Sequence, residues 1–202
     1  MSQITSLEQL SALYGEPSKR AKNKAMDHID DFSRTMIEHS PYIVLSTVDQ
    51  NGFTDVSPRG GQPGFVKVLD RKTLLIPDSA GNNRIDSFRN LLERPQMGLM
   101  ILVPGVDEVV RIKGRVSLHT DPHYSERCPD GAKPAKLVMK VAVEEAYFHC
   151  GKAIMRARLW DNHYRVDRNI LPSLAQIMKA QQNMQEEVMG QEEMIAYYRE
   201  SL

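Results

Sequence analysis

Residues 57–61, with the sequence SPRGG, could bind a phosphate group. We expect Ser57, Arg59 and Gly60 at the end of a β-strand. The planar guanidinium of an arginine can donate two parallel hydrogen bonds to a phosphate, and glycine lets the backbone approach the same group closely. A glycine-rich turn with a surface arginine has the same composition. These residues therefore favour either an anion site or a simple turn.

A second candidate anion site, PDSAGNNR, runs directly into a predicted helix. Its candidate ligand-binding residues are Pro77, Asp78, Ser79, Asn82, Asn83 and Arg84. The first N–H groups of a helix have no partner within the helix, and the helix dipole favours an anion there. Capping of the helix by Asn82 or Asn83 explains the same residues without a ligand. The spacing is neither GxGxxG nor GxxxxGK[ST], which argues against a dinucleotide or nucleoside-triphosphate site.

Two further segments carry residues with possible chemistry. The segment VVRIKGR alternates apolar and basic residues, so that Arg111 could face a pocket or could lie on a solvated strand face. Cys150 follows a histidine in the segment HCGKA, but no nucleophile motif surrounds it, and we expect a packed cysteine there. Trp160 is expected in the core or at an interface. No histidine spacing indicates a metal site.

The elements that must position these residues change in type along the chain. Residues 1–40 read as helical, and a helix is predicted over residues 18–38 because Ala25, Ile29, Phe32 and Met36 recur at helical spacing. Residues 41–160 form short strands joined by tight turns, interrupted by one helix over residues 84–92. Residues 161–202 are polar and form a helical extension. The pattern predicts a single domain that is mainly β, with flanking helices.

Composition narrows the class of protein. Lysine plus arginine and aspartate plus glutamate number 26 each among 202 residues, which argues against a general nucleic-acid binder. With two cysteines the chain is not a disulfide scaffold. The N-terminus lacks the pattern of a signal peptide, and no apolar run approaches the roughly 20 residues that span a membrane. We therefore expect a cytoplasmic protein that contacts no nucleic acid or membrane.

The order of the segments adds to what each one indicates. SPRG, PGFV, GNNR, VPG and HCGKAIMRARLW follow one another between residues 57 and 160. Over residues 25–160 the chain resembles the FMN-binding split-barrel flavoproteins related to pyridoxamine 5'-phosphate oxidase. The resemblance implies an antiparallel split β-barrel and a homodimer with two FMN sites at the subunit interface. It places Arg59 and Arg84 at the flavin phosphate, and Pro77 and Asp78 beside the flavin.

The same resemblance implies an FMN-dependent oxidoreductase that acts on a small molecule. Val109 stands where the oxidase has a glutamine, so oxidation of pyridoxamine phosphate is not predicted. Three alternatives stay open: a flavin-binding storage or sensor protein without turnover, a split barrel that binds a deazaflavin or haem in place of FMN, and an interaction protein without flavin.

Overall fold

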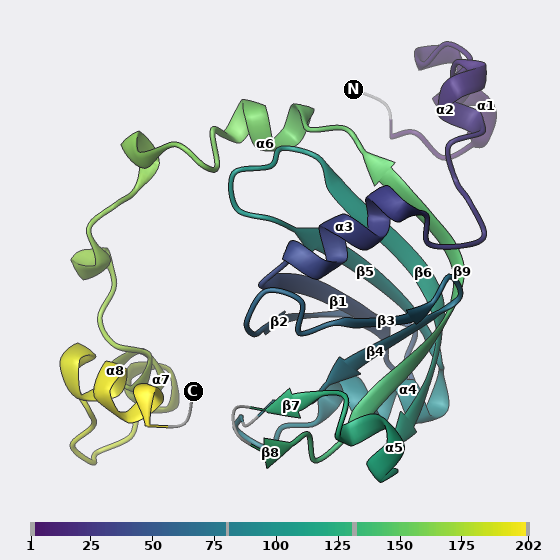
Figure 1. The fold of residues 1–202 in the computed structure, drawn as a ribbon. Helices are drawn as coiled ribbons and strands as arrows, with labels where there is room; N and C mark the ends of the chain where they lie inside the picture. The colour runs from purple at the N-terminus through teal and green to yellow at the C-terminus, as the bar shows by residue number, and fades with distance from the viewer. Residues whose placement is uncertain (1–2, 80, 131–132, 201–202) are drawn as a thin grey trace.

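The computed structural model describes residues 3–79, 81–130 and 133–200. Its main feature is a seven-stranded antiparallel sheet with the order β2-β1-β5-β6-β9-β4-β3. The strands are β1 (Tyr42–Val48), β2 (Thr54–Gly60), β3 (Lys67–Asp70), β4 (Thr73–Pro77), β5 (Gln96–Leu102), β6 (Val109–His119) and β9 (Val138–His149). The sheet curves strongly, with β2 and β3 as its two edges (Figure 1). This is an open, split barrel, and the predicted fold class is confirmed.

The central strand β6 shows how the sequence pattern builds the sheet. Val110, Ile112 and Val116 are buried, whereas Arg111 and the other basic residues between them point outward, as the period-two alternation predicts. β6 pairs with β5 on one side and with β9 on the other. Gly114 lies at a register shift between β6 and β9, where a Cβ atom would collide with the carbonyl oxygen of Ala142.

The helix predicted over residues 18–38 is wrong, because two separate helices occupy this region. The first, α2 (Lys19–Lys22), ends before Met26, which exchanges backbone hydrogen bonds of 2.9 and 2.8 Å with Ala146 of β9. The second, α3 (Asp31–His39), begins where the side chain of Asp30 accepts a hydrogen bond from the Ser33 N–H. The spacing of the apolar residues is misleading here, because Phe32, although it lies in α3, is 75% exposed and does not belong to a buried face.

The helices are distributed around the curved sheet. α3 packs against β3, β5, β6 and β9, and α4 (Asp86–Glu93) packs against β1 and β6. α5 (Pro122–Ser125) precedes the short hairpin of β7 (Pro129–Asp130) and β8 (Lys133–Pro134), and α6 (Lys152–Ala157) follows β9. α1 (Leu7–Leu13) and α2 contribute no buried residue. The core is therefore formed by the sheet together with α3 and α4.

After α6 the chain leaves the sheet. It passes through the 3-10 turns η1 (Asn162–Tyr164) and η2 (Arg168–Ile170) to α7 (Leu174–Gln182) and α8 (Gln191–Arg199), which pack on each other to one side of the barrel (Figure 1). Met194 and Ser173 are buried within this pair. The division of the chain at residues 40 and 160 stays a prediction.

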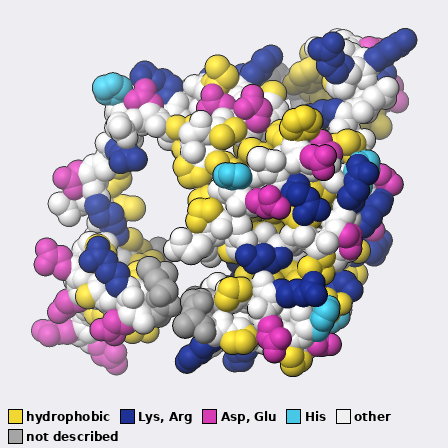
Figure 2. Space-filling view, in the orientation of Figure 1, with side chains coloured by type: hydrophobic (Ala, Val, Ile, Leu, Met, Phe, Trp, Pro, Cys, Tyr) yellow, Lys and Arg dark blue, Asp and Glu magenta, His cyan; other side chains and the backbone are white. Residues whose placement is uncertain are grey.

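Basic and acidic side chains are interspersed over the visible face of the molecule (Figure 2). This distribution agrees with the equal numbers of the two charges in the sequence. None of the helices in the described part of the chain is long and apolar enough to cross a membrane.

Candidate functional site

The two candidate anion-binding segments line a single cavity. β2 forms one wall, and the loop between β4 and α4 with the first turn of α4 forms the other. The cavity has a volume of about 350 Å³. Seven of the predicted site residues line it: Ser57, Arg59, Asp78, Ser79, Asn82, Asn83 and Arg84. Segments that are separate in the sequence therefore meet in space, which is required if Arg59 and Arg84 are to contact one phosphate.

The alternation of β2 places Arg59 in this cavity. Asp55, Ser57 and Arg59 are the more buried residues of the strand and share one side of it. The Arg59 guanidinium lies 5.2 Å from the centre of the Phe88 ring, a cation–π distance, and its Nη1 atom is 3.5 Å from an Asp78 carboxylate oxygen. Its Nε atom is buried and has no hydrogen-bond partner among the described residues. A buried donor of this kind is suited to an added acceptor.

The other wall ends at an uncapped helix start. Ile85 occupies the N-cap position of α4 and provides no side-chain hydrogen bond. The Asn82 side chain instead accepts a hydrogen bond of 3.1 Å from the Arg84 N–H, and Asn83 adopts a left-handed conformation with φ of 58°. Capping by either asparagine, the alternative to a ligand, is therefore not observed. The N-terminus of α4 faces the cavity without a side-chain acceptor of its own.

Carboxylates balance the positive charge of the cavity. Asp86 lies 2.6 Å from the Nε atom of Arg84 and raises the pKa of this guanidinium. Asp55 and Asp78 line the same cavity. A phosphate that binds here must compete with these carboxylates for the hydrogen bonds that the arginines donate. Arg59, 20% exposed, is better shielded from water than Arg84, 81% exposed, so we expect its hydrogen bond to a ligand to be the stronger.

Three predicted site residues do not line this cavity. Gly60 ends β2 and Pro77 ends β4, each next to a residue that does. Arg111 lines a different cavity of about 660 Å³, which is mostly apolar and is formed by β1, β5, β6, β9 and α6. Val56 lines both cavities, so the two adjoin at β2. The structure therefore does not bring Arg111 together with Arg59 and Arg84 in one cavity of a single chain.

The sequence interpretation missed Asp55, Ser87 and Phe88, which also line the first cavity. The sequence could have indicated Asp55, because it precedes Ser57 by two residues and therefore lies on the same side of the strand as Ser57 and Arg59. Phe88 was assigned only to the apolar face of its helix, and nothing local marks it as a partner of a residue 29 positions away.

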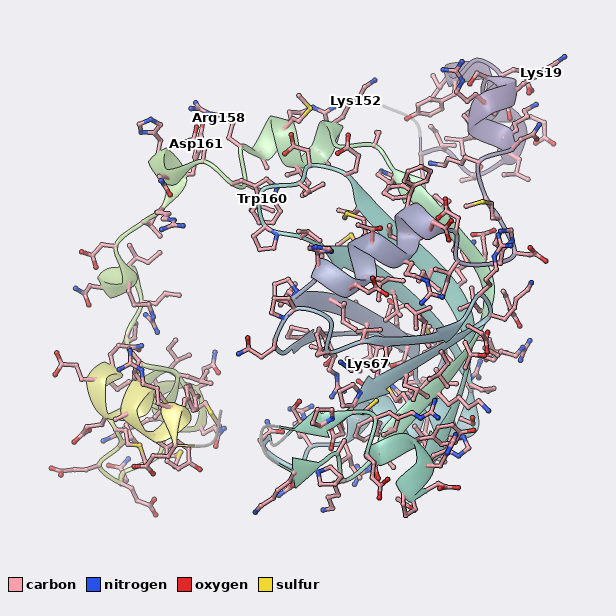
Figure 3. The ribbon with its side chains drawn as sticks, in the orientation of Figure 1. Lys19, Lys67, Lys152, Arg158, Trp160 and Asp161 are labelled. Carbon is pink, nitrogen blue, oxygen red and sulfur yellow. The ribbon has the colours of Figure 1, made fainter. Side chains whose placement is uncertain are left out.

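The two cysteines have opposite environments. Cys150 is exposed at the end of β9, so the expectation of a packed cysteine there is wrong. Cys128 is the buried one, and burial raises the pKa of its thiol to about 11. Trp160 donates a hydrogen bond of 3.0 Å to the Val106 carbonyl (labelled in Figure 3). Among the described residues, no group of three His, Cys, Asp or Glu side chains is placed to hold a metal ion.

Comparison with known families finds a sequence match over most of the sheet. The sequence model described as pyridoxamine 5'-phosphate oxidase matches residues 29–150, more than half of the chain. The chain belongs to the pyridoxamine 5'-phosphate oxidase family. The match covers β1 to β9 and both walls of the cavity, and it ends before α6. No curated protein matches the sequence at a significant level.

Among solved structures, the chain is similar to HupZ of Group A Streptococcus, with 19% identity, a TM-score of 0.48, and coverage of 59% of this chain and 93% of that one. An FMN-binding protein from Syntrophomonas wolfei shows 16% identity and a TM-score of 0.46, with 59% and 89% coverage. General stress protein 26 from Bacillus anthracis shows 13% identity and a TM-score of 0.43, with 57% and 88% coverage.

Proposed function

We propose that this member of the family binds FMN with its phosphate in the cavity between β2 and the start of α4. The observation that carries the proposal is the meeting of Arg59 and Arg84 in one cavity. The buried Nε atom of Arg59, which has no partner among the described residues, and the uncapped start of α4 provide donors suited to a phosphate. These features fit the phosphate end of the cofactor, and we call this space the phosphate cavity.

The adjoining apolar cavity fits the flat ring of the flavin. It shares Val56 with the phosphate cavity, and β2 is an edge strand of the sheet, so we propose that a ligand with one anionic and one planar end passes over this edge from one cavity into the other. Most of its lining is apolar, which suits an aromatic ring system. In this arrangement Arg111, whose guanidinium lies 5.3 Å from the centre of the Tyr147 ring, provides a positive charge near the flavin ring.

We further propose a homodimer with the flavin at the interface. The wall of the apolar cavity faces outward in the single chain, and Val56 and Met100 on it are 62% and 37% exposed. A second copy packed on this face would bury these side chains and exclude water from the ring. Light scattering on the purified protein tests this proposal: a mass of one chain at micromolar concentration would contradict it.

As an enzyme, the protein would be an oxidoreductase that acts on a small molecule. FMN, when bound, supplies hydride or electron transfer. The residues of the chain anchor the phosphate through Arg59 and Arg84 and shield the ring from water through the apolar wall. A flavin-binding protein without turnover uses the same residues. Reduction assays of the FMN-loaded protein, with a panel of electron donors and acceptors, separate these two functions.

The binding proposal is tested by titrating the purified protein with FMN and following the quenching of flavin fluorescence. We expect saturable binding of FMN at micromolar concentration and much weaker binding of riboflavin, which lacks the phosphate. Parallel titrations with haem and a deazaflavin test the alternative cofactors, and a Soret band would indicate haem. The FMN proposal is falsified if FMN fluorescence is not quenched or if either alternative binds more tightly than FMN.

A further inference from the structure

A second basic cavity lies where residues 18–24 meet the end of β9 and the start of α6. Its volume is about 730 Å³. Its lining includes Arg20, Lys24, Glu108, His149, Cys150 and Lys152. None of these residues lines the cavity that contains Arg59 and Arg84. We call it the Lys152 cavity.

The positive charge of the Lys152 cavity is only partly balanced. Arg20, Lys24 and Lys152 face one carboxylate, that of Glu108. In the described part of the chain none of these three cations lies within ion-pair distance of an acidic side chain. The Lys24 ammonium lies instead 4.6 Å from the centre of the Tyr147 ring. Three cations around one hollow raise the local concentration of anions.

The side chain of His149 also lines the Lys152 cavity. Its Nδ1 atom is buried and has no hydrogen-bond partner among the described residues. His149 and Cys150 line both the Lys152 cavity and the apolar cavity beside β1, β5 and β6. A basic pocket and an apolar pocket therefore meet at these two residues.

α6 is held in place by a close contact at its start and by a hydrogen bond just after its end. Gly151 packs so tightly on Asp107 that a Cβ atom at this position would lie 2.6 Å from the Asp107 side chain. The indole N–H of Trp160 donates to the Val106 carbonyl at 3.0 Å. Both contacts fix α6 to the loop between β5 and β6, and Figure 3 shows Lys152 on this helix. Cys150 and Lys152 thus flank a residue that has little freedom to move.

We propose that the Lys152 cavity binds the anionic end of a small molecule whose apolar body enters the adjoining apolar cavity at the side of His149 and Cys150, beside the space proposed for the flavin ring. The ligand class is an amphipathic carboxylate or phosphate. As a binding site the cavity does not depend on the flavin. As the substrate site of the oxidoreductase it rests on the proposed function, because only then does the apolar end of the ligand reach a flavin ring.

The exposed thiol of Cys150 is a built-in reporter of this cavity. We compare its reaction with dithiobis-nitrobenzoate, an anionic aromatic disulfide, and with dithiodipyridine, a neutral one. In each reaction the Cys150 thiolate attacks a reagent sulfur, a protein–reagent S–S bond forms, the reagent S–S bond breaks, and an aromatic thiolate leaves with the bonding electrons. Cys128 does not compete, because it is buried and its pKa is raised to about 11. A Cys150→Ser variant verifies the assignment of the signal.

The variants change the charge of the cavity at exposed positions. We expect Lys152→Ala to lower, several-fold, the ratio of the rate with dithiobis-nitrobenzoate to the rate with dithiodipyridine. The double variant Lys152→Ala with Lys24→Ala should lower this ratio about tenfold, within the range of electrostatic steering. The double variant should also lose most of the salt dependence of the anionic rate. Lys133→Ala, in the β7–β8 hairpin at the opposite end of the molecule, is the matched control (Figure 1). Unchanged ratios in both cavity variants would overturn the proposal.

Protection experiments test the ligand class directly. Octanoate carries an anionic end and an apolar body, whereas acetate and inorganic phosphate lack the body and octanol lacks the charge. We expect octanoate to slow the reaction of Cys150 with dithiodipyridine more than the other three compounds, and Lys152→Ala to weaken this protection. Equal protection by octanol and octanoate would reject the anion site.

These readouts separate the two proposals. FMN affinity is measured on the same Lys152→Ala protein, and we expect it to match that of the unaltered chain, because Lys152 lines neither the phosphate cavity nor the apolar cavity proposed for the flavin ring. A protein that fails to bind FMN but keeps the charge-dependent reactivity of Cys150 would contradict only the proposed flavin function.

Discussion

The phosphate cavity and the Lys152 cavity are both lined by basic side chains, but they differ in how far nearby carboxylates neutralise these charges. In the phosphate cavity Asp78 and Asp86 contact the two arginines, and the Arg59 guanidinium also packs on an aromatic ring. In the Lys152 cavity the three cations have no such acidic contact among the described residues and are exposed. The first arrangement fixes the direction of its donors and suits one ligand geometry. The arrangement in the Lys152 cavity mainly attracts anions and accepts ligands of different shapes.

The largest expected effect is on FMN binding by an Arg59→Ala variant. Loss of a charged hydrogen bond costs about 1.5–3 kcal/mol, which is roughly a ten- to hundredfold increase in Kd. Arg84→Ala should cost less, because water screens its exposed guanidinium. Arg115→Ala, which breaks an ion pair between Arg115 of β6 and Glu144 of β9, is the control and should leave Kd unchanged. A larger effect for Arg84 than for Arg59 would reverse the ranking.

Gly151→Ala should disturb the Lys152 cavity and spare the phosphate cavity. The added methyl group would press on Asp107 and displace the start of α6. We expect a loss of about 1–3 kcal/mol in the free energy of unfolding, measured by urea denaturation, together with a changed rate of Cys150 modification. Gly15→Ala is the matched control, because a Cβ atom there meets no atom within 4 Å. A Gly151→Ala protein of unaltered stability would show that this contact relaxes freely.

Asp86→Asn should strengthen FMN binding. The carboxylate of Asp86 holds the Arg84 guanidinium at 2.6 Å and repels a phosphate. Its neutralisation should lower the Kd by up to about fivefold, the range of an exposed ion pair. Asp161→Asn breaks a similar pair with Arg158 on the segment that follows α6 (Figure 3). Neither residue lines the phosphate cavity, and this variant should have no effect on Kd. Weaker FMN binding by Asp86→Asn would mean that this carboxylate contacts the ligand favourably.

The smallest expected effect concerns alkaline pH. Burial raises the pKa of Cys128 to about 11, so the folded state keeps this thiol neutral more strongly than the unfolded state does. The resulting stability is fully present below the unfolded pKa of about 8.5 and is lost as the pH rises toward about 11. Urea midpoints between these values should fall less steeply for Cys128→Ala than for the unaltered chain. Parallel slopes would contradict the burial argument.

The sequence was most informative where periodicity or local motifs determine structure. The alternation along β6 predicted its buried and outward faces, and the segments around Arg59 and Arg84 marked the cavity walls. The spacing of apolar residues failed over residues 18–38, because Met26 pairs with Ala146 of β9 and α3 starts only after its cap Asp30, while Phe32 within α3 is exposed. The Lys152 cavity was not foreseen, because Arg20 and Lys24 reach Lys152 only through tertiary contacts of the N-terminal segment.

Arg59 is proposed to bind the phosphate of the cofactor, and one thermodynamic cycle tests this role. Kd values are measured for FMN and riboflavin with the unaltered protein and with Arg59→Ala. We predict that the variant loses most of its affinity for FMN but changes little in its affinity for riboflavin, so that the preference for the phosphorylated ligand falls at least tenfold. An equal loss for both ligands, or none for FMN, would place the phosphate elsewhere.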